Sequence, residues 1–177
     1  MYCACFMSHR VMKMKSTFLF IGVLISSLSF CQTNYGIKKL YAYYEERMPG
    51  NIAVGEDGRA TKKYPTVEHH IYVETTSKTR IQWKAAWKDG KSFTLSSTEV
   101  NEFPAVPGKR KLDMENIEIT PSKGNKLWKI EFTADSRSTK PPVKAKKGEL
   151  ILQGIYNGKK IYKRIKVEIE LYSPPSV

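Results

Sequence analysis

The chain has 177 residues and a formal net charge of +13, from 30 Lys and Arg against 17 Asp and Glu. A hydrophobic fraction of 41% and an aromatic fraction of 11% exclude a disordered chain. The length favours a single domain whose core needs no disulfide or metal to hold it. The positive charge favours contact with anionic surfaces but specifies no fold.

Residues 1–31 have the layout of a secretory signal peptide. Arg10, Lys13 and Lys15 precede an apolar run from Phe18 to Phe30, and no acidic residue occurs before Glu45. The run is shorter than the roughly 20 apolar residues that cross a bilayer, so we expect no transmembrane segment. Residues 1–11 are interpreted as an over-extended start. We therefore expect a periplasmic or secreted protein with one domain over residues 32–177.

The end of the signal has two interpretations. Ser29 and Cys31 are small enough for ordinary cleavage after Cys31, which leaves a soluble product. The alternative is a lipoprotein anchored through Cys31. Because Cys3, Cys5 and Cys31 all lie in the leader, we expect residues 32–177 to contain no disulfide, thiol nucleophile or thiolate metal site.

Hydrophobic alternation with a period of two predicts strands along the rest of the chain. Asp89-Gly90 and Asn157-Gly158 are typical of tight hairpin turns. The sequences at 48–65, 104–111 and 136–148 are rich in glycine, proline and charge and predict loops. The predicted strands are 36–47, 66–76, 80–88, 91–97, 115–120, 126–134, 149–156 and 159–171.

About eight strands and no amphipathic helix predict a single antiparallel β-sandwich of immunoglobulin-like architecture. An up-and-down β-barrel is the alternative topology. On the last strand we expect the apolar residues from Ile161 to Leu171 to face inward. In the segment from Thr66 to Thr76, Tyr72 and Glu74 are expected to face outward.

The sequence offers no convincing catalytic or metal-binding set. His69 and His70 are neighbours on a strand, so their rings point to opposite faces, and we expect one half-buried and one solvated ring. Adjacent Glu45 and Glu46 fail as a catalytic pair for the same reason. Glu168 and Glu170 share a face at a glycosidase-like separation, but we interpret them as a solvated ion-pair surface.

Other motifs also have structural explanations. The glycine-rich segment 50–58 lacks the lysine of a phosphate-binding loop, and no serine lies in Gly-x-Ser-x-Gly. We therefore expect no enzyme, no cofactor and no metal. Trp83 and Trp87 are predicted to share one face and to pack in the core. In the alternative function, a carbohydrate-binding module or small-ligand barrel, they form an aromatic platform that Tyr41 and Tyr43 extend.

The basic C-terminal region is the one feature that indicates binding. Residues 122–166 hold 13 Lys and Arg against 3 acids. Our first hypothesis is an exported, non-catalytic module that binds or scaffolds an envelope protein, an anionic glycan or lipid headgroups, with nucleic acid disfavoured because exposed aromatics are few. The candidate binding residues are Lys144, Lys146, Lys147, Lys160, Arg164 and Lys166.

Overall fold

The computed structural model describes residues 35–47, 66–135 and 139–174, all within the compact unit Tyr35–Val177. Every helix or strand assigned in these ranges is a strand, which confirms the all-β prediction. No stretch of these ranges forms a helix that could span a bilayer. The predicted signal, its cleavage site, the three cysteines and the loop 48–65 lie outside the described residues.

The described part of the chain contains ten strands. They are β1 (Ile37–Arg47), β2 (Thr66–Thr76), β3 (Gln82–Lys88), β4 (Lys91–Val100), β5 (Ala105–Lys109), β6 (Asn116–Ile119), β7 (Asn125–Ala134), β8 (Leu150–Tyr156), β9 (Lys159–Ile165) and β10 (Ile169–Leu171).

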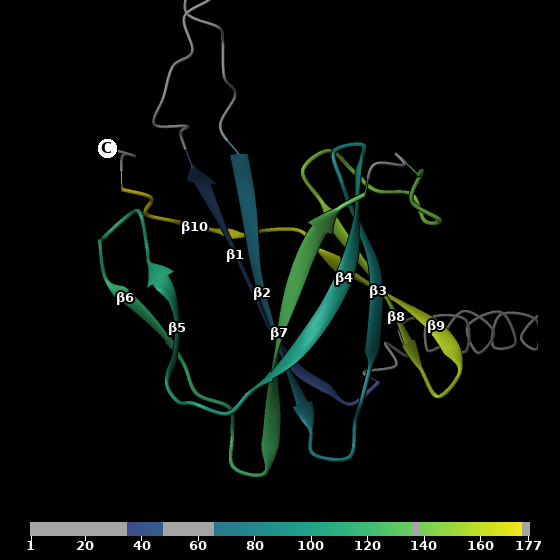
Figure 1. Cartoon of the computed structure of the whole chain (residues 1–177), viewed down its shortest axis with the longest axis horizontal. Helices are drawn as coiled ribbons and strands as arrows, with labels where there is room; N and C mark the ends of the chain where they lie inside the picture. The colour runs from purple at the N-terminus through teal and green to yellow at the C-terminus, as the bar shows by residue number, and fades with distance from the viewer. Residues whose placement is uncertain (1–34, 48–65, 136–138, 175–177) are drawn as a thin grey trace, which may run out of the picture. The chain divides into compact units, whose positions relative to one another are not determined.

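Eight of these strands form one continuous sheet in the order β10-β1-β2-β7-β4-β3-β8-β9, and β5 pairs with β6 in a separate hairpin (Figure 1). All neighbours in the large sheet are antiparallel except β1 and β10, which run parallel. The sheet is therefore mixed and curls into a half-barrel. The two separate sheets of the predicted sandwich are not confirmed.

The two outermost strands of this sheet follow each other in the chain. Only Lys166, Val167 and Glu168 connect β9 to β10, and we call these three residues the link. A flat sheet would place its first and eighth strands about 34 Å apart. Ile165 and Ile169 are four residues apart, so their Cα atoms are separated by at most about 14 Å. The sheet must curl to satisfy this connection.

The inner face of the curled sheet holds the larger hydrophobic core. Ile71 and Val73 of β2 meet Leu150 and Leu152 of β8 there, and all four are fully buried. Strands far apart in the sheet order share this cluster because curling brings their inner faces together. At one end Tyr35, just before β1, packs edge-on against Tyr156 of β8 with ring centroids 6.0 Å apart.

A second core lies on the outer face of β1, β2 and β7, where the β5–β6 hairpin covers it. Ile117 and Ile119 of β6 pack against Tyr43, Tyr72 and Leu127. This hairpin also continues the sheet at the β10 edge, where the Lys111 amide donates to the Glu170 carbonyl at 3.0 Å. The β10 edge is thus covered, whereas β9 forms the other edge of the sheet.

The prediction that Tyr72 and Glu74 face solvent is wrong, because both side chains are buried. The Glu74 carboxylate is buried and accepts hydrogen bonds from the Ser122 amide at 3.0 Å and the Asn125 amide group at 2.5 Å. Burial raises the pKa of Glu74, but these hydrogen bonds outweigh it and hold the pKa below its usual value. A buried carboxylate therefore anchors the turn that leads into β7.

Three further predictions of strand geometry are wrong. A bulge shifts the register between Trp83 and Ala85, so Trp83 lies on the inner face and Trp87 on the outer face. A strand, β5, forms inside the predicted loop 104–111. The predicted strand 159–171 is broken at the link, which leaves Val167 78% exposed.

Gly154 tests the tight packing of the inner core. A Cβ at this position would lie 2.7 Å from Ile81 Cγ2 and 3.2 Å from Trp83 Cε3, and both side chains are buried. We expect Gly154→Ala to lower the free energy of unfolding by about 1–2 kcal/mol, because overpacking outweighs the reduced backbone entropy. Urea denaturation measures the change, and a stabilised variant would contradict the packing.

Candidate functional site

The structure places the six predicted binding residues on the surface around β9 and the segment before β8. Lys144, Lys146 and Lys147 are exposed in that segment, Lys160 and Arg164 are exposed on β9, and Lys166 is exposed in the link. We call this set the basic surface. From residue 139 to residue 166 the chain carries nine Lys and Arg and a single acid, Glu149.

Arg164 joins the two halves of the basic surface. Its guanidinium donates to the Lys144 carbonyl at 2.8 Å and lies 3.5 Å from the Glu149 carboxylate. Glu149 is buried and also accepts from the Lys146 amide at 2.9 Å. The one acid of the region is thus used internally to fix the loop beside β9, and it does not neutralise the exposed lysines around it.

Two other contacts hold the same segment in place. The Gly148 amide donates to the Asp89 carboxylate at 2.7 Å, and the Trp87 indole N–H donates to the Thr139 hydroxyl at 3.0 Å. The lysines between these anchors therefore extend from a loop tied at several points to β3, β9 and the β3–β4 turn.

The tryptophans do not form an exposed platform. Trp83 is 4% exposed and Trp87 is 7% exposed, and the bulge places them on opposite faces of the sheet. Trp128 is half-buried against the inner core, with its indole N–H donating to Thr75. The prediction that Trp83 and Trp87 pack in the interior is confirmed, and the two rings are not available together for stacking on a sugar.

A buried ionic cluster lies where the link crosses the inner side of the sheet. The Glu168 carboxylate accepts a hydrogen bond from His69 Nδ1 on β2 at 2.7 Å and pairs with the Lys88 ammonium at the end of β3. The side chains of Glu168 and His69 are each 4% exposed. The link is thereby fastened to two strands of the sheet.

The environment of this cluster is aromatic. The His69 ring packs against Phe93 and Phe132 with centroids 5.9 and 5.3 Å away, and the Lys88 ammonium lies 5.5 Å from the centre of the Tyr44 ring. Burial raises the pKa of Glu168, but His69 and Lys88 outweigh this effect and hold the pKa below its usual value. Glu168 is therefore ionised and paired.

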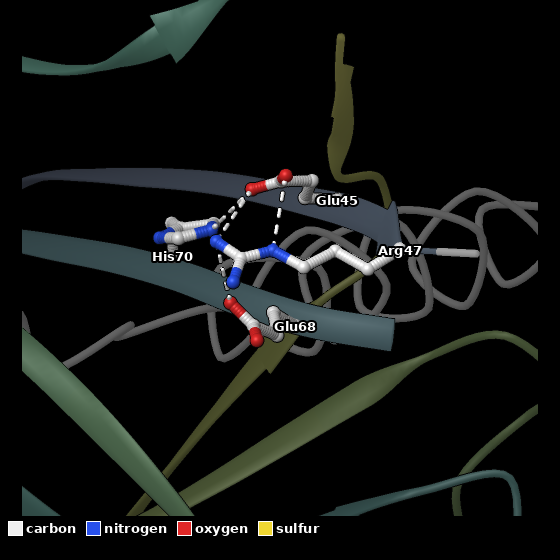
Figure 2. Close-up of polar contacts among 4 residues, drawn as sticks. All are labelled: Glu45, Arg47, Glu68 and His70. Carbon is white, nitrogen blue, oxygen red and sulfur yellow. Dashed lines mark hydrogen bonds and ion pairs between the residues drawn. The ribbon is translucent and has the colours of Figure 1, made fainter. Parts of the chain in front are cut away.

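A second polar cluster lies on the outer face of β1 and β2, and we call it the Glu–His cluster: Glu45, Arg47, Glu68 and His70. Figure 2 shows the Arg47 guanidinium between the two carboxylates, beside the imidazole. Arg47 Nε lies 3.1 Å from Glu45 Oε1, and Arg47 Nη2 lies 3.2 Å from Glu68 Oε2. His70 Nε2 lies 3.5 Å from Glu45 Oε2. Glu45 and Glu68 are direct partners in the strand register.

Burial raises the pKa of Glu45, but hydrogen bonds from Arg47 and Ser173 lower the pKa by more. The Glu45 pKa therefore lies below its usual value. The Arg47 pKa is raised in turn by its hydrogen bond to Glu45. At neutral pH the Glu45 carboxylate is therefore ionised and paired with the Arg47 guanidinium.

These clusters correct several predictions about single residues. His69 and His70 do point to opposite faces, as predicted, but neither ring is solvated, because their side chains are 4% and 19% exposed. Glu168 is buried rather than part of a solvated surface, and Glu170 pairs separately with Lys111 at 2.6 Å.

Sequence reasoning missed both clusters because their members come from distant parts of the chain and meet only in the folded sheet. His69 and Glu168 are 99 positions apart in the chain.

Comparisons with protein-family models, with curated proteins and with solved structures find no match to this chain.

Glu168→Gln tests whether the buried cluster fastens the link. The substitution keeps the shape of the side chain but leaves Lys88, which is 19% exposed, without its counter-charge. We expect the free energy of unfolding at pH 7 to fall by about 2–3 kcal/mol. Glu170→Gln, at a carboxylate that is 30% exposed, is the matched control and should have a smaller effect.

The stability of the wild type relative to Glu168→Gln should also depend on pH. The Glu168 pKa is lower in the folded chain than its ordinary value of 4.5, so its stabilisation is complete above that pH. It is lost as the pH falls through the folded-state pKa. The stability difference between the wild type and Glu168→Gln should therefore shrink below about pH 4.5. Urea unfolding from pH 3 to pH 7 measures it, and a constant difference would contradict the assignment.

Proposed function

We propose that the chain is an exported, non-catalytic β-module, related in architecture to a sandwich, which binds the anionic surface of the cell envelope. The basic surface is the binding site in this proposal. Acidic glycan and anionic lipid headgroups present the same chemistry to it, namely closely spaced negative charges that exposed lysines attract at long range.

The observation that carries the proposal is the unbalanced charge of a fixed segment. Nine cationic side chains lie between residues 139 and 166, and the only acid there is buried beneath them. Arg164 joins the loop to β9, so the lysines of both elements occupy one region. A solvated surface without a partner usually intersperses the two signs of charge, which limits self-repulsion.

Export is supported by the basic and apolar leader in residues 1–31, and it determines which anions the basic surface meets. A non-catalytic role is supported by the way the buried ionic cluster is used. Glu168, His69 and Lys88 satisfy one another in the interior, and their charges hold the link in place.

Replacing Lys144, Lys146 and Lys160 with glutamine tests the proposal. Each lysine near a charged membrane contributes about 1 kcal/mol, so the triple variant should bind vesicles containing phosphatidylglycerol about a hundredfold more weakly. Vesicle co-sedimentation measures the affinity, and a parallel measurement with an acidic polysaccharide distinguishes lipid from glycan. Binding by the wild type should weaken steeply with added salt.

Lys78, Lys109 and Lys123 are exposed lysines outside the basic surface, and their replacement with glutamine is the matched control. It removes the same total charge and should leave most of the binding intact. Equal losses in the two triple variants would mean that net charge alone attracts the chain. Absence of wild-type binding to both probes at low salt would refute the proposal.

A further inference from the structure

From the Glu–His cluster we propose a second site: Glu45, Glu68 and His70 bind a divalent transition-metal ion of the Zn²⁺ type, and Arg47 competes with the metal for the two carboxylates. This site lies on β1 and β2 and is separate from the basic surface of the proposed function.

The strand register brings the three ligands together. Glu45 of β1 lies directly opposite Glu68 of β2, and His70 lies two residues further along β2 on the same face. One donor atom from each side chain lies within 4.8 Å of the other two. A tetrahedral ion with bonds of about 2.0–2.1 Å needs donors about 3.4 Å apart. The donor atoms therefore need to approach one another by at most about 1.4 Å, which rotamer adjustment supplies.

His70 Nε2 provides an independent indication of a ligand site. The atom is buried and has no hydrogen-bond partner among the described residues, although it lies 3.5 Å from the Glu45 carboxylate. A buried, unpaired ring nitrogen costs free energy, and a metal bond would satisfy it. The nitrogen is directed at the carboxylate that would be its co-ligand, as Figure 2 shows.

The donor set selects the class of ion. One imidazole nitrogen with two carboxylate oxygens suits Zn²⁺ and similar ions, whereas Ca²⁺ and Mg²⁺ prefer all-oxygen sites. The Glu68 side chain is 42% exposed, so solvent reaches the site and a water molecule completes the fourth position.

Arg47 is the competitor because its one positive charge already contacts both carboxylates. Its side chain is 54% exposed and it is the last residue of β1, so it is able to turn into solvent when a metal enters. A divalent ion supplies one more positive charge and also engages His70, which the guanidinium does not. Removing Arg47 should therefore strengthen metal binding.

Isothermal titration with ZnCl₂ tests the site on the full chain, with Cys3, Cys5 and Cys31 replaced by serine in every variant so that thiolates do not bind the metal. We expect one site that depends on these side chains. Arg47→Gln should bind at least tenfold more tightly than the wild type. His70→Asn and Glu68→Gln should each bind at least tenfold more weakly.

Glu46→Gln is the matched control, because Glu46 neighbours both β1 members of the cluster but projects to the other face of the strand. It should leave the affinity unchanged. Glu68 is partly exposed, so Glu68→Gln is a loss variant that keeps its fold, and far-UV circular dichroism checks this. Visible absorption of the Co²⁺-loaded chain should report a tetrahedral site that disappears in His70→Asn.

The proposal is overturned if neither the wild type nor Arg47→Gln binds Zn²⁺ at this site. It is equally overturned if His70→Asn and Glu68→Gln bind as tightly as the wild type. A loss of affinity in Glu46→Gln as large as that in Glu68→Gln would overturn it too, because general loss of negative charge, and not ligation by Glu68, would then control the affinity.

Discussion

The three-residue link between β9 and β10 is the constraint on which the rest of the structure depends. It joins strands at opposite ends of the eight-strand order, so the sheet cannot lie flat. Curling closes the inner core, and it brings the link across the sheet, where Glu168 meets His69 and Lys88. A buried charge, normally costly, is acceptable here because both partners are within contact distance.

Because the sheet is curled, its inner and outer faces are covered by different groups. The inner face is filled by apolar side chains from seven of the eight strands and by the cluster around Glu168. On the outer face, the β5–β6 hairpin covers one flank, and the segment before β8 covers Trp87 on the other. The two candidate sites are the basic surface around β9 and the Glu–His cluster on the outer face of β1 and β2.

Local chemistry in the sequence was enough to predict most strands. The alternation in 126–134 and the Asn157-Gly158 turn depend only on neighbouring residues, and both predictions are confirmed. The bulge at Lys84 and the break at the link were missed, because the apolar alternation continues across both of them, from Trp83 to Trp87 and from Ile165 to Leu171. Burial of Glu74 was missed because it depends on Ser122 and Asn125, far along the chain.

The candidate sites also differ in how far they depend on contacts between distant residues. The lysines of the basic surface are visible in composition, and their joining through Arg164 required the pairing of β8 with β9. The Glu–His cluster could not be predicted, since it depends on the register that sets Glu45 opposite Glu68. Adjacent residues such as His69 and His70 attract attention in a sequence, yet each one joins partners on a different face.

The contact between Tyr35 and Tyr156 gives the most direct test of the curled sheet. Tyr35 lies just before β1, and Tyr156 is the last residue of β8. These two strands are five places apart in the strand order of the sheet, which is about 24 Å in a flat sheet. In the structure the ring centroids are 6.0 Å apart. Nuclear Overhauser spectroscopy should therefore show cross-peaks between protons of the two rings. Assigned rings without any such cross-peak would contradict the closure imposed by the link.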